Sequence, residues 1–293
     1  MKASLHTLVP WQAKIAVKMA LSRLPIPMRT WHRLGLFVPG FMRDPDYAIG
    51  VFERHWRRAG APGSGFRYLE IGPGESLSTA IVAWAFGASG GALVDAGDFA
   101  VRDLESYRPL IDRLSRRATV RNVRPLESVA SFGALLEAVN AVVRTDGVDG
   151  LKSLPADSFD LIFSQAVLEH VPLGSFGVLA RELYRLQKIS GLGSHRIDFK
   201  DHLQGSLHNL RFSEGVWEKP WFAARSGFYT NRLRLSAVVR AFEEAGFAVA
   251  VTERDTWTAL PLPRAKLAAP FCDLPEDELK TSGAVLVLTK GRG

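Results

Sequence analysis

Short apolar runs alternate with amphipathic stretches along most of this chain. The runs typical of buried strands are 67–71, 92–95, 138–144, 159–164, 193–199, 248–253 and 284–290. The stretches with helical spacing between and after them are 76–86, 99–114, 131–137, 175–187 and 235–245. Strands that alternate with helices favour a parallel, doubly wound α/β sheet. We therefore predict one α/β domain over residues 61–293.

Residues 1–60 contain no obvious strand and are predicted to form a helical N-terminal extension. Asp44 is placed to cap a helix over 47–58, and the Gly- and Pro-containing segment 60–65 is a linker by composition. Nearer the N-terminus, apolar and basic residues recur at helical spacing: Lys14, Ile15, Lys18, Met19, Ala20, Arg23 and Leu24. Such a basic amphipathic helix packs on its own domain or associates peripherally with a membrane surface, and the sequence leaves both alternatives open.

The most informative segment is Tyr68-Leu-Glu-Ile-Gly-Pro-Gly74, an apolar run that stops abruptly in a glycine-rich turn. On the order of 20 residues later a second short run ends in Asp95, which is the spacing of a nucleotide-binding unit. Glycine lets the backbone approach a ligand closely, and the next helix directs its free N–H groups to the same place. A buried strand, a turn without side-chain bulk and a carboxylate at the next strand end indicate a nucleoside-binding site.

The same turn argues against a dinucleotide. The third glycine of GxGxxG is replaced by Leu77, and Glu75 would repel a phosphate. Glu70 is a carboxylate in an otherwise buried strand, so it needs a partner, which backbone N–H groups or a ligand ammonium would provide. A cationic amino-acid ligand therefore fits better than a diphosphate. A turn without any ligand would leave Glu70 and Asp95 unexplained.

Two segments resemble a known family. Glu70-Ile-Gly-Pro-Gly74 resembles the first motif of class I S-adenosylmethionine-dependent methyltransferases, and 154–171 resembles their fourth-strand segment. The resemblance covers about residues 65–290. It implies a Rossmann-like, seven-stranded, mostly parallel sheet with an antiparallel last strand, S-adenosyl-L-methionine as cofactor, and methyl transfer as activity. One departure is the turn Lys188-Ile-Ser-Gly191, where the family usually has Lys-Pro-Gly-Gly.

The resemblance also implies roles for individual residues. Glu70 and the backbone at Gly72 and Gly74 would hold the methionine moiety. Asp95 would accept hydrogen bonds from the ribose hydroxyls, with Asp98 as its substitute. The residues expected near the adenine and along the cofactor at the fourth strand are Asp146 or Gly147, and Ser164, Gln165 and Ala166.

Candidate catalytic groups follow the fourth and fifth predicted strands. His195, Asp198, Asp201 and His202 begin inside the fifth strand and run past its end, where doubly wound sheets bind their ligands. They could provide a histidine base oriented by an aspartate, bind a divalent metal, or only fix the following segment to the core. Their spacing is too loose for us to predict a metal centre. His170, beside Glu169, is a further candidate base, or it bonds only to backbone.

The segment 200–232 is irregular and rich in aromatic and amide side chains, including Trp217, Trp221 and Asn231. Aromatic faces with amide and guanidinium donors suit a sugar-like acceptor, so we predict an acceptor-side insert or lid. The alternative is a lid whose aromatic side chains are simply buried. Two stretches of this region, 194–203 and 227–232, are similar to methyltransferases found with polysaccharide-assembly enzymes. The predicted reaction is therefore O-methylation of a glycan or a small hydroxylated acceptor.

Composition narrows the remaining choices. The net charge is +7, but the basic residues are scattered and carry no nucleic-acid-binding signature, so anionic substrates or a membrane face are the expected partners. The single cysteine, Cys272, excludes an intrachain disulfide and fits the reducing cytoplasm. No run approaches the roughly 20 apolar residues of a membrane span. The rival functions are a non-catalytic cofactor-binding scaffold and a nicotinamide-dependent oxidoreductase.

Overall fold

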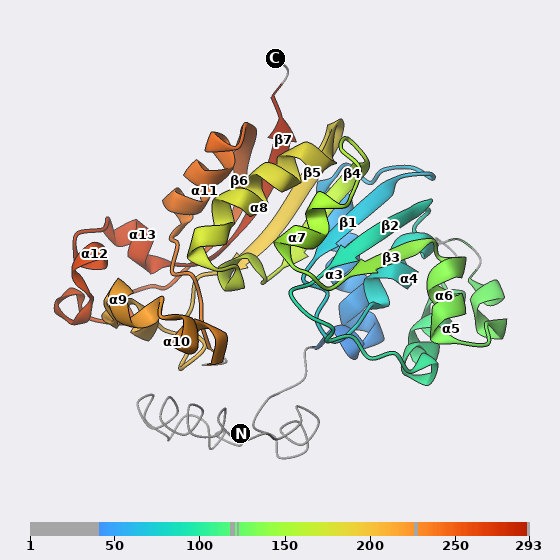
Figure 1. The fold of residues 1–293 in the computed structure, drawn as a ribbon, viewed down its shortest axis with the longest axis horizontal. Coiled ribbons are helices and arrows are strands. Elements are labelled where there is room, and N and C mark those ends of the chain that lie inside the picture. Colours follow the sequence, from blue (N-terminus) through green and yellow to red (C-terminus); the bar gives the residue numbers. More distant parts are fainter. Residues whose placement is uncertain (1–40, 118–120, 122, 226–227, 292–293) are drawn as a thin grey trace.

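The computed structural model describes residues 41–117, 121, 123–225 and 228–291 (Figure 1). Its strands are β1 (Arg67–Ile71), β2 (Gly90–Val94), β3 (Ala141–Arg144), β4 (Phe159–Gln165), β5 (Gln187–Asp198), β6 (Phe247–Thr256) and β7 (Thr281–Lys290). Its α-helices are α3 (Pro45–Arg58), α4 (Ser78–Ala85), α5 (Arg108–Ser115), α6 (Phe132–Ala138), α7 (Val148–Lys152), α8 (Leu173–Leu186), α9 (Glu214–Trp217), α10 (Pro220–Arg225), α11 (Leu235–Glu244), α12 (Ala269–Cys272) and α13 (Glu276–Lys280). Single 3-10 turns are η2 (Phe41–Arg43), η3 (Leu104–Tyr107), η4 (Arg124–Ser128), η5 (Leu168–His170), η6 (His208–Arg211) and η7 (Arg264–Lys266).

The strands form one seven-stranded sheet in the order β3-β2-β1-β4-β5-β7-β6. β7 runs antiparallel to both of its neighbours, whereas the pairs among β1 to β5 are parallel. This confirms the predicted mostly parallel α/β sheet with an antiparallel last strand. The order reverses between β1 and β4, and doubly wound sheets bind ligands outside the carboxyl ends of the strands at such a point.

The fourth strand is central, as its apolar run predicts. β4 pairs with β1 on one side and β5 on the other, and Leu161, Ile162 and Phe163 are fully buried. Asp160 lies at its start, where it accepts a hydrogen bond from the Arg67 N–H at 2.8 Å. Gln165 lies at the opposite end, on the side where the parallel strands point.

Helices cover both faces of the sheet and give it two apolar cores. The side chains that α7, α8 and α11 pack on one face include Leu151, Phe176, Leu183 and Phe242. Those that α3, α4, α5 and α6 pack on the other include Phe52, Ile81, Leu110 and Leu135. The sheet is thereby buried between two layers, which explains why its inner strands are continuous apolar runs and do not alternate.

The second predicted helix of the N-terminal extension belongs to the main core. Asp44 caps α3 by accepting a hydrogen bond from the Tyr47 N–H at 2.8 Å, as predicted. The Phe52 ring lies edge-on to Phe163 of β4, with ring centroids 5.7 Å apart. The compositional break at 60–65 therefore does not separate α3 from the sheet. The basic helix predicted around residues 14–24 lies outside the described residues.

Several predicted boundaries differ from the structure for local reasons. β3 begins at Ala141 because Asn140, with φ 51°, ends α6. The helix predicted over 99–114 is only α5, since Asp103 caps the 3-10 turn η3 ahead of it and Pro109 stands in its first turn. β5 extends back to Gln187, although 188–191 has the composition of a turn. Helices of four to six residues, such as α7, α9 and α10, are too short for periodicity to reveal.

The described residues of the segment 200–232 form an insert with its own apolar core. The side chains that form it are Leu203, Trp217, Phe222, Phe228 and Tyr229. In Figure 1 the insert, with α9 and α10, lies at one end of the sheet, opposite the C-terminus. Because β7 is antiparallel and ends at the C-terminus, the insert lies at the carboxyl ends of the parallel strands. Within the described part of the chain, no helix has the length and apolarity to span a bilayer.

Candidate functional site

The turn after β1 combines close packing with open space. Gly72 has φ 70°, and a Cβ built on it would lie 2.4 Å from Val167 Cγ1, so this position has no room for a side chain. Its N–H donates to the Val94 carbonyl oxygen at 2.8 Å. Gly74 has φ 67°, but nothing lies within 4 Å of its virtual Cβ. The first glycine therefore packs against β4's following residues, and the second exposes backbone that a ligand can reach.

Asp95 joins this turn to the ends of β2 and β3. Its Oδ2 accepts a hydrogen bond from the Gly74 N–H at 2.8 Å, and its Oδ1 accepts one from the Ala96 N–H at 2.7 Å. Its main-chain oxygen accepts from the Gly147 N–H, also at 2.8 Å. Burial raises the pKa of Asp95, and the two backbone donors oppose that shift. The side chain is only half-buried, so the remaining lone pairs of its carboxylate stay open to a ligand.

Glu70 is placed differently from its implied role. Its carboxyl group is buried beside the first turn of α4, where the Thr79 hydroxyl donates a hydrogen bond to it. Burial raises the Glu70 pKa to about 8, Thr79 opposes the shift, and the negative charge of Asp95 adds to it. Thr79 is thus the partner that a carboxylate in a buried strand requires. The geometry assigns Glu70 to holding the turn and α4 together.

The pKa of Glu70 makes stability depend on pH. Glutamate in the unfolded chain has its ordinary pKa of 4.5, whereas burial raises the pKa of Glu70 in the folded state to about 8, so only the folded state holds this proton between these values. The stability that Glu70 contributes is therefore fully present below pH 4.5 and is lost as pH rises to about 8. We expect Glu70→Gln to remove this decline. Its free energy of unfolding should exceed that of the wild type by about 3–5 kcal/mol at pH 9 and differ little at pH 5. Urea unfolding at both pH values measures this. Equal pH slopes for the two proteins would contradict it.

The other implied cofactor residues lie at or beside the same edge of the sheet. Gly147 follows β3 with φ 59° and bonds to Asp95, and Asp146 beside it is exposed. Ala166 follows β4 with φ 53°, a left-handed conformation that is uncommon without glycine and is enriched at functional sites. Asp98 is on the surface, where it pairs with Arg102 at 3.0 Å. The hydrogen bonds thus link Gly74, Asp95 and Gly147 directly, whereas the side chain of Asp98 pairs with Arg102.

The end of β4 is held by a histidine that sequence reasoning missed. His55 of α3 is fully buried; its Nε2 lies 3.2 Å from Gln165 Oε1 and its Nδ1 lies 2.8 Å from the Ser194 hydroxyl. Burial, with the nearby Arg58 charge, lowers the His55 pKa to about 3, so the ring is neutral and donates to the amide oxygen from Nε2. The signal in the sequence was the helical spacing that turns His55 to the same face as Phe52.

The structure places one predicted catalytic residue, His195, and one predicted cofactor contact, Ser164, away from the surface of the strand ends. His195 is fully buried under the sheet, where its Nδ1 bonds to the Ser164 hydroxyl at 2.8 Å and its ring stacks on Phe242 at 5.8 Å. Burial lowers its pKa to about 3. Ser164, expected to line the cofactor, is buried with it. Neither side chain reaches the surface of the strand ends, so we do not keep them among the proposed contact residues.

Asp201 is also structural. Its buried carboxylate accepts hydrogen bonds from four main-chain N–H groups, at 2.7–3.1 Å, contributed by Leu203, Gln204, Ser206 and His208. These bonds fix the first turn of the insert and leave no proton-transfer role for the carboxylate. Asp198 ends β5 and accepts from the Lys200 N–H at 2.9 Å. It is half-buried and close enough to Glu169 to affect it electrostatically.

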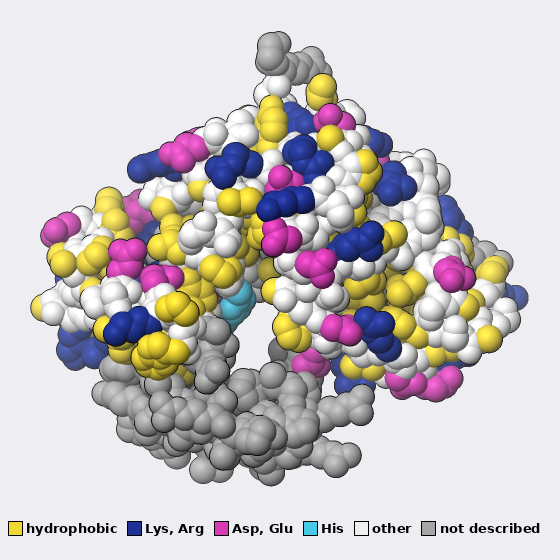
Figure 2. All heavy atoms as spheres, viewed as in Figure 1, with side chains coloured by type: hydrophobic (Ala, Val, Ile, Leu, Met, Phe, Trp, Pro, Cys, Tyr) yellow, Lys and Arg dark blue, Asp and Glu magenta, His cyan; other side chains and the backbone are white. Residues whose placement is uncertain are grey.

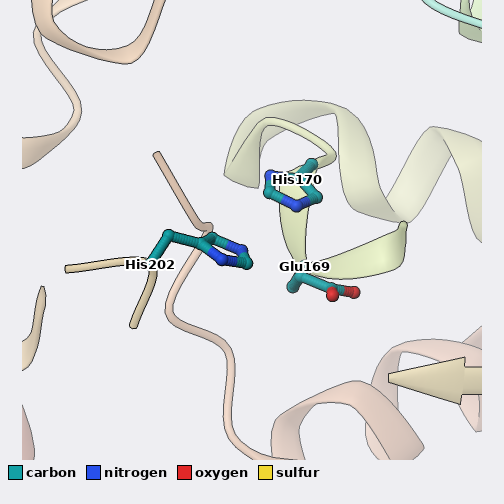
Figure 3. A group of neighbouring side chains, drawn as sticks. All are labelled: Glu169, His170 and His202. Carbon is teal, nitrogen blue, oxygen red and sulfur yellow. The ribbon is translucent and has the colours of Figure 1, made fainter. Parts of the chain in front are cut away.

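The remaining candidates, His170 and His202, meet at the acceptor side together with Glu169. Figure 3 shows His202 reaching from the segment after β5 towards His170 and Glu169 on the turn after β4. The two imidazole rings stack with centroids 4.8 Å apart and planes 13° apart. One ligand atom from each of the three residues lies within 4.8 Å of the others. Sequence reasoning named His170 and His202 separately, but only the fold brings them together.

The cluster is electrostatically unusual. Burial raises the Glu169 pKa to about 8, and the charge of Asp198 adds to the shift. Neither carboxylate oxygen has a hydrogen-bond partner among the described residues, although the main-chain N–H groups of Glu169 and Asp198 are near. The His170 ring is open to solvent yet crowded by protein, as expected for the wall of a concavity, and this crowding and His202 lower its pKa to about 4. Perturbed groups in such a place are typical of functional sites.

The aromatic side chains of the insert mostly face inward. Trp217 is fully buried, and its indole N–H donates to the Thr230 carbonyl at 2.7 Å. Trp221 is the large aromatic of the described insert that stays exposed, at 48%. Of the aromatic side chains predicted to stack on an acceptor, Trp221 is the one that remains exposed. The buried aromatic side chains fit the alternative, a lid whose aromatic residues pack inside it. Figure 2 shows the surface hollowed beside the insert, with a histidine side chain at the edge of the hollow.

Comparison with known proteins gives similarity only at the level of solved structures. No protein-family model matches this chain, and no curated protein matches it. A Burkholderia thailandensis 1,6-didemethyltoxoflavin-N1-methyltransferase with bound S-adenosylhomocysteine is 12% identical over 99% of this chain and 93% of that chain, with TM-score 0.47. A Haemonchus contortus phosphoethanolamine N-methyltransferase is 15% identical over 83% of this chain and 53% of that chain, with TM-score 0.47. A SAM-dependent methyltransferase from Archaeoglobus fulgidus is 12% identical over 82% of this chain and 93% of that chain, with TM-score 0.43.

Proposed function

We propose that this protein is an S-adenosylmethionine-dependent methyltransferase. The observation that carries the proposal is the hydrogen-bonded set of Gly74, Asp95 and Gly147 at the carboxyl ends of β1, β2 and β3. It stands beside the reversal of strand order, where doubly wound sheets bind nucleosides. The open space at Gly74 and the free lone pairs of Asp95 fit an adenosine whose ribose hydroxyls and amino-acid end need acceptors.

Residues at the ends of β1, β2 and β3 would each contact a different part of the cofactor. Asp95 would accept from the ribose hydroxyls, the main chain at Gly74 would face the methionine moiety, and Gly147 would lie beside the adenine. Glu70 would act indirectly, by fixing the turn through Thr79. When bound, S-adenosyl-L-methionine supplies a methyl group activated on a sulfonium sulfur. The protein's task is then to position an acceptor in line and to assist loss of its proton.

The acceptor-side cluster supports an oxygen acceptor. A hydroxyl is a poor nucleophile near neutral pH, so its methylation benefits from a group that removes or displaces its proton. His170, with Nε2 directed away from its bond to the Tyr229 main chain, stands beside His202 and Glu169 at the strand ends. Trp221, on α10 of the insert, is exposed and offers a stacking face for a sugar ring. We propose a sugar-like or other small hydroxylated acceptor and a cytoplasmic location.

Calorimetry tests the cofactor directly. We expect the purified protein to bind S-adenosylmethionine and S-adenosylhomocysteine, and not NAD. Binding of NAD without either of the other compounds would overturn the proposal in favour of an oxidoreductase. Incubation with radiolabelled cofactor and fractionated cell extract then identifies which class of molecule takes the label. Cofactor binding without any labelled product would favour the non-catalytic scaffold.

A further inference from the structure

Three side chains that can ligate a metal ion converge after β4 and β5: Glu169, His170 and His202. Their ligand atoms lie within 4.8 Å of one another. Bonds of about 2.0–2.2 Å to a common ion would place these atoms about 3.5 Å apart, so they need to approach by about 1 Å. The two imidazole planes are nearly parallel, at 13°, so the exposed His202 ring has to turn before both histidines can direct a lone pair at one ion.

His170 is oriented as a ligating histidine is. Its Nδ1 lies 3.0 Å from the Tyr229 main-chain oxygen, which can only accept, so Nδ1 carries the proton. The lone pair is then on Nε2, the atom on the far side of the ring. Histidine ligands almost always donate their other N–H to a carbonyl or carboxylate, because this fixes the tautomer and the direction of the ring.

Glu169 is a buried carboxyl group whose two oxygens have no hydrogen-bond partner among the described residues. A buried polar group without a partner is costly, and a bound ion explains why it is tolerated. The turn that carries it is held firmly by Asn231. The Asn231 N–H donates to the Glu169 main-chain oxygen at 2.7 Å, and its amide donates to the oxygens of Leu168 and Val171 at 2.8 and 3.0 Å.

His202 is presented by an equally ordered turn. Asp201, its neighbour, binds four main-chain N–H groups of the residues that follow and so fixes the backbone that carries the imidazole. Asp198, at the end of β5, interacts electrostatically with both Glu169 and His170. Asp198 is itself paired with Lys200 at 3.5 Å, so the support for the ligand set comes from the surrounding layer of hydrogen bonds that fixes its backbone.

We propose that Glu169, His170 and His202 bind one divalent transition-metal ion, Zn²⁺ or an ion of similar ligand preference. Two imidazoles and one carboxylate suit Zn²⁺, Co²⁺ or Mn²⁺ better than Mg²⁺ or Ca²⁺, which prefer oxygen ligands. Three protein ligands leave a position open for an oxygen atom of another molecule. This deepens the proposed function and rests on it only for the identity of that molecule, a hydroxylated acceptor, since binding of the ion requires no methyl transfer.

The test measures metal binding without any activity assay. Tag-free protein is stripped with a chelator, dialysed against Zn²⁺ or Co²⁺, and analysed for bound metal by mass spectrometry and for the visible absorption of Co²⁺. We expect one ion per chain and a rise in melting temperature. His202→Ala, His170→Ala and Glu169→Gln should each weaken affinity by at least about a hundredfold, beyond the effect of losing an outer hydrogen bond. His208→Ala, which removes an imidazole of the same insert outside the cluster, should bind like the wild type.

The experiment distinguishes failure of the metal site from failure of the proposed function. The proposal would be overturned if the folded wild-type protein bound less than one equivalent of every ion tried. It would also be overturned if all three ligand variants bound the ion with wild-type affinity. Melting curves show whether each variant is folded. Glu169→Gln is the most informative, since it keeps the shape of the side chain and an oxygen that faces the nearby main-chain N–H groups, and should leave the fold intact. If the protein bound the ion but not S-adenosylmethionine, the metal site would be supported and the proposed methyltransferase function would be contradicted.

Discussion

Alanine in place of Asp95 is expected to weaken the binding of S-adenosylhomocysteine by about ten- to a hundredfold. The carboxylate would lose charge-assisted hydrogen bonds to the ribose hydroxyls, worth about 1.5–3 kcal/mol. It would also release the Gly74 N–H, which it holds at 2.8 Å, so that the turn facing the ligand is less ordered before binding. Calorimetric titration of both proteins measures the change.

Asp98→Ala is the matched control. This aspartate follows the same strand and has the same charge, but it is exposed and paired with Arg102 on the surface. We expect it to bind the ligand like the wild type. If Asp98→Ala weakened binding while Asp95→Ala did not, the ribose contact would have been assigned to the wrong carboxylate. Equal affinity in all three proteins would place the ligand away from β2.

The sequence predicted well those elements whose signal is local. The apolar runs of β1 and β4 end at residues of a different kind, so their positions along the chain and the glycine turn after β1 could be predicted. Asp44 as a helix cap depends on its neighbour three residues away, which is also local. The mostly parallel sheet with an antiparallel last strand came from the resemblance and from the alternation of elements, and the order of its strands was not predicted. Short helices and the early start of β5 had no such local signal.

The site was harder to predict because its contacts join distant parts of the chain. Nothing near Ser194 indicates His55, which precedes it by 139 positions and bonds to its hydroxyl. The position of His195 in the predicted fifth strand did not indicate that its ring stacks on Phe242 of α11 in the buried layer. The four main-chain bonds of Asp201 depend on a turn conformation that composition does not specify. The resemblance pointed to the ends of β1 to β4, and the fold then showed which side chains meet there.

Alanine in place of His170 is expected to lower turnover by about 10²–10⁴ while leaving the affinity for S-adenosylhomocysteine unchanged. The imidazole lies on the acceptor side. Its Nδ1 donates a hydrogen bond to the main-chain oxygen of Tyr229 in the insert, and not to the glycine turn. Its loss should therefore affect the reacting hydroxyl and not the cofactor. Initial rates with the acceptor found by labelling, together with calorimetry, measure both quantities.

His202→Ala should cause a loss of similar size, because the two stacked rings serve one acceptor position. Residues that act as a unit are strongly non-additive, so the double variant should be little slower than either single one. His208→Ala, which removes an imidazole from the same insert but outside the cluster, should turn over at the wild-type rate. Full activity in both His170→Ala and His202→Ala would make the cluster structural. Multiplicative losses in the double variant would instead give the two histidines separate tasks, which the 4.8 Å convergence of their ligand atoms with Glu169 argues against.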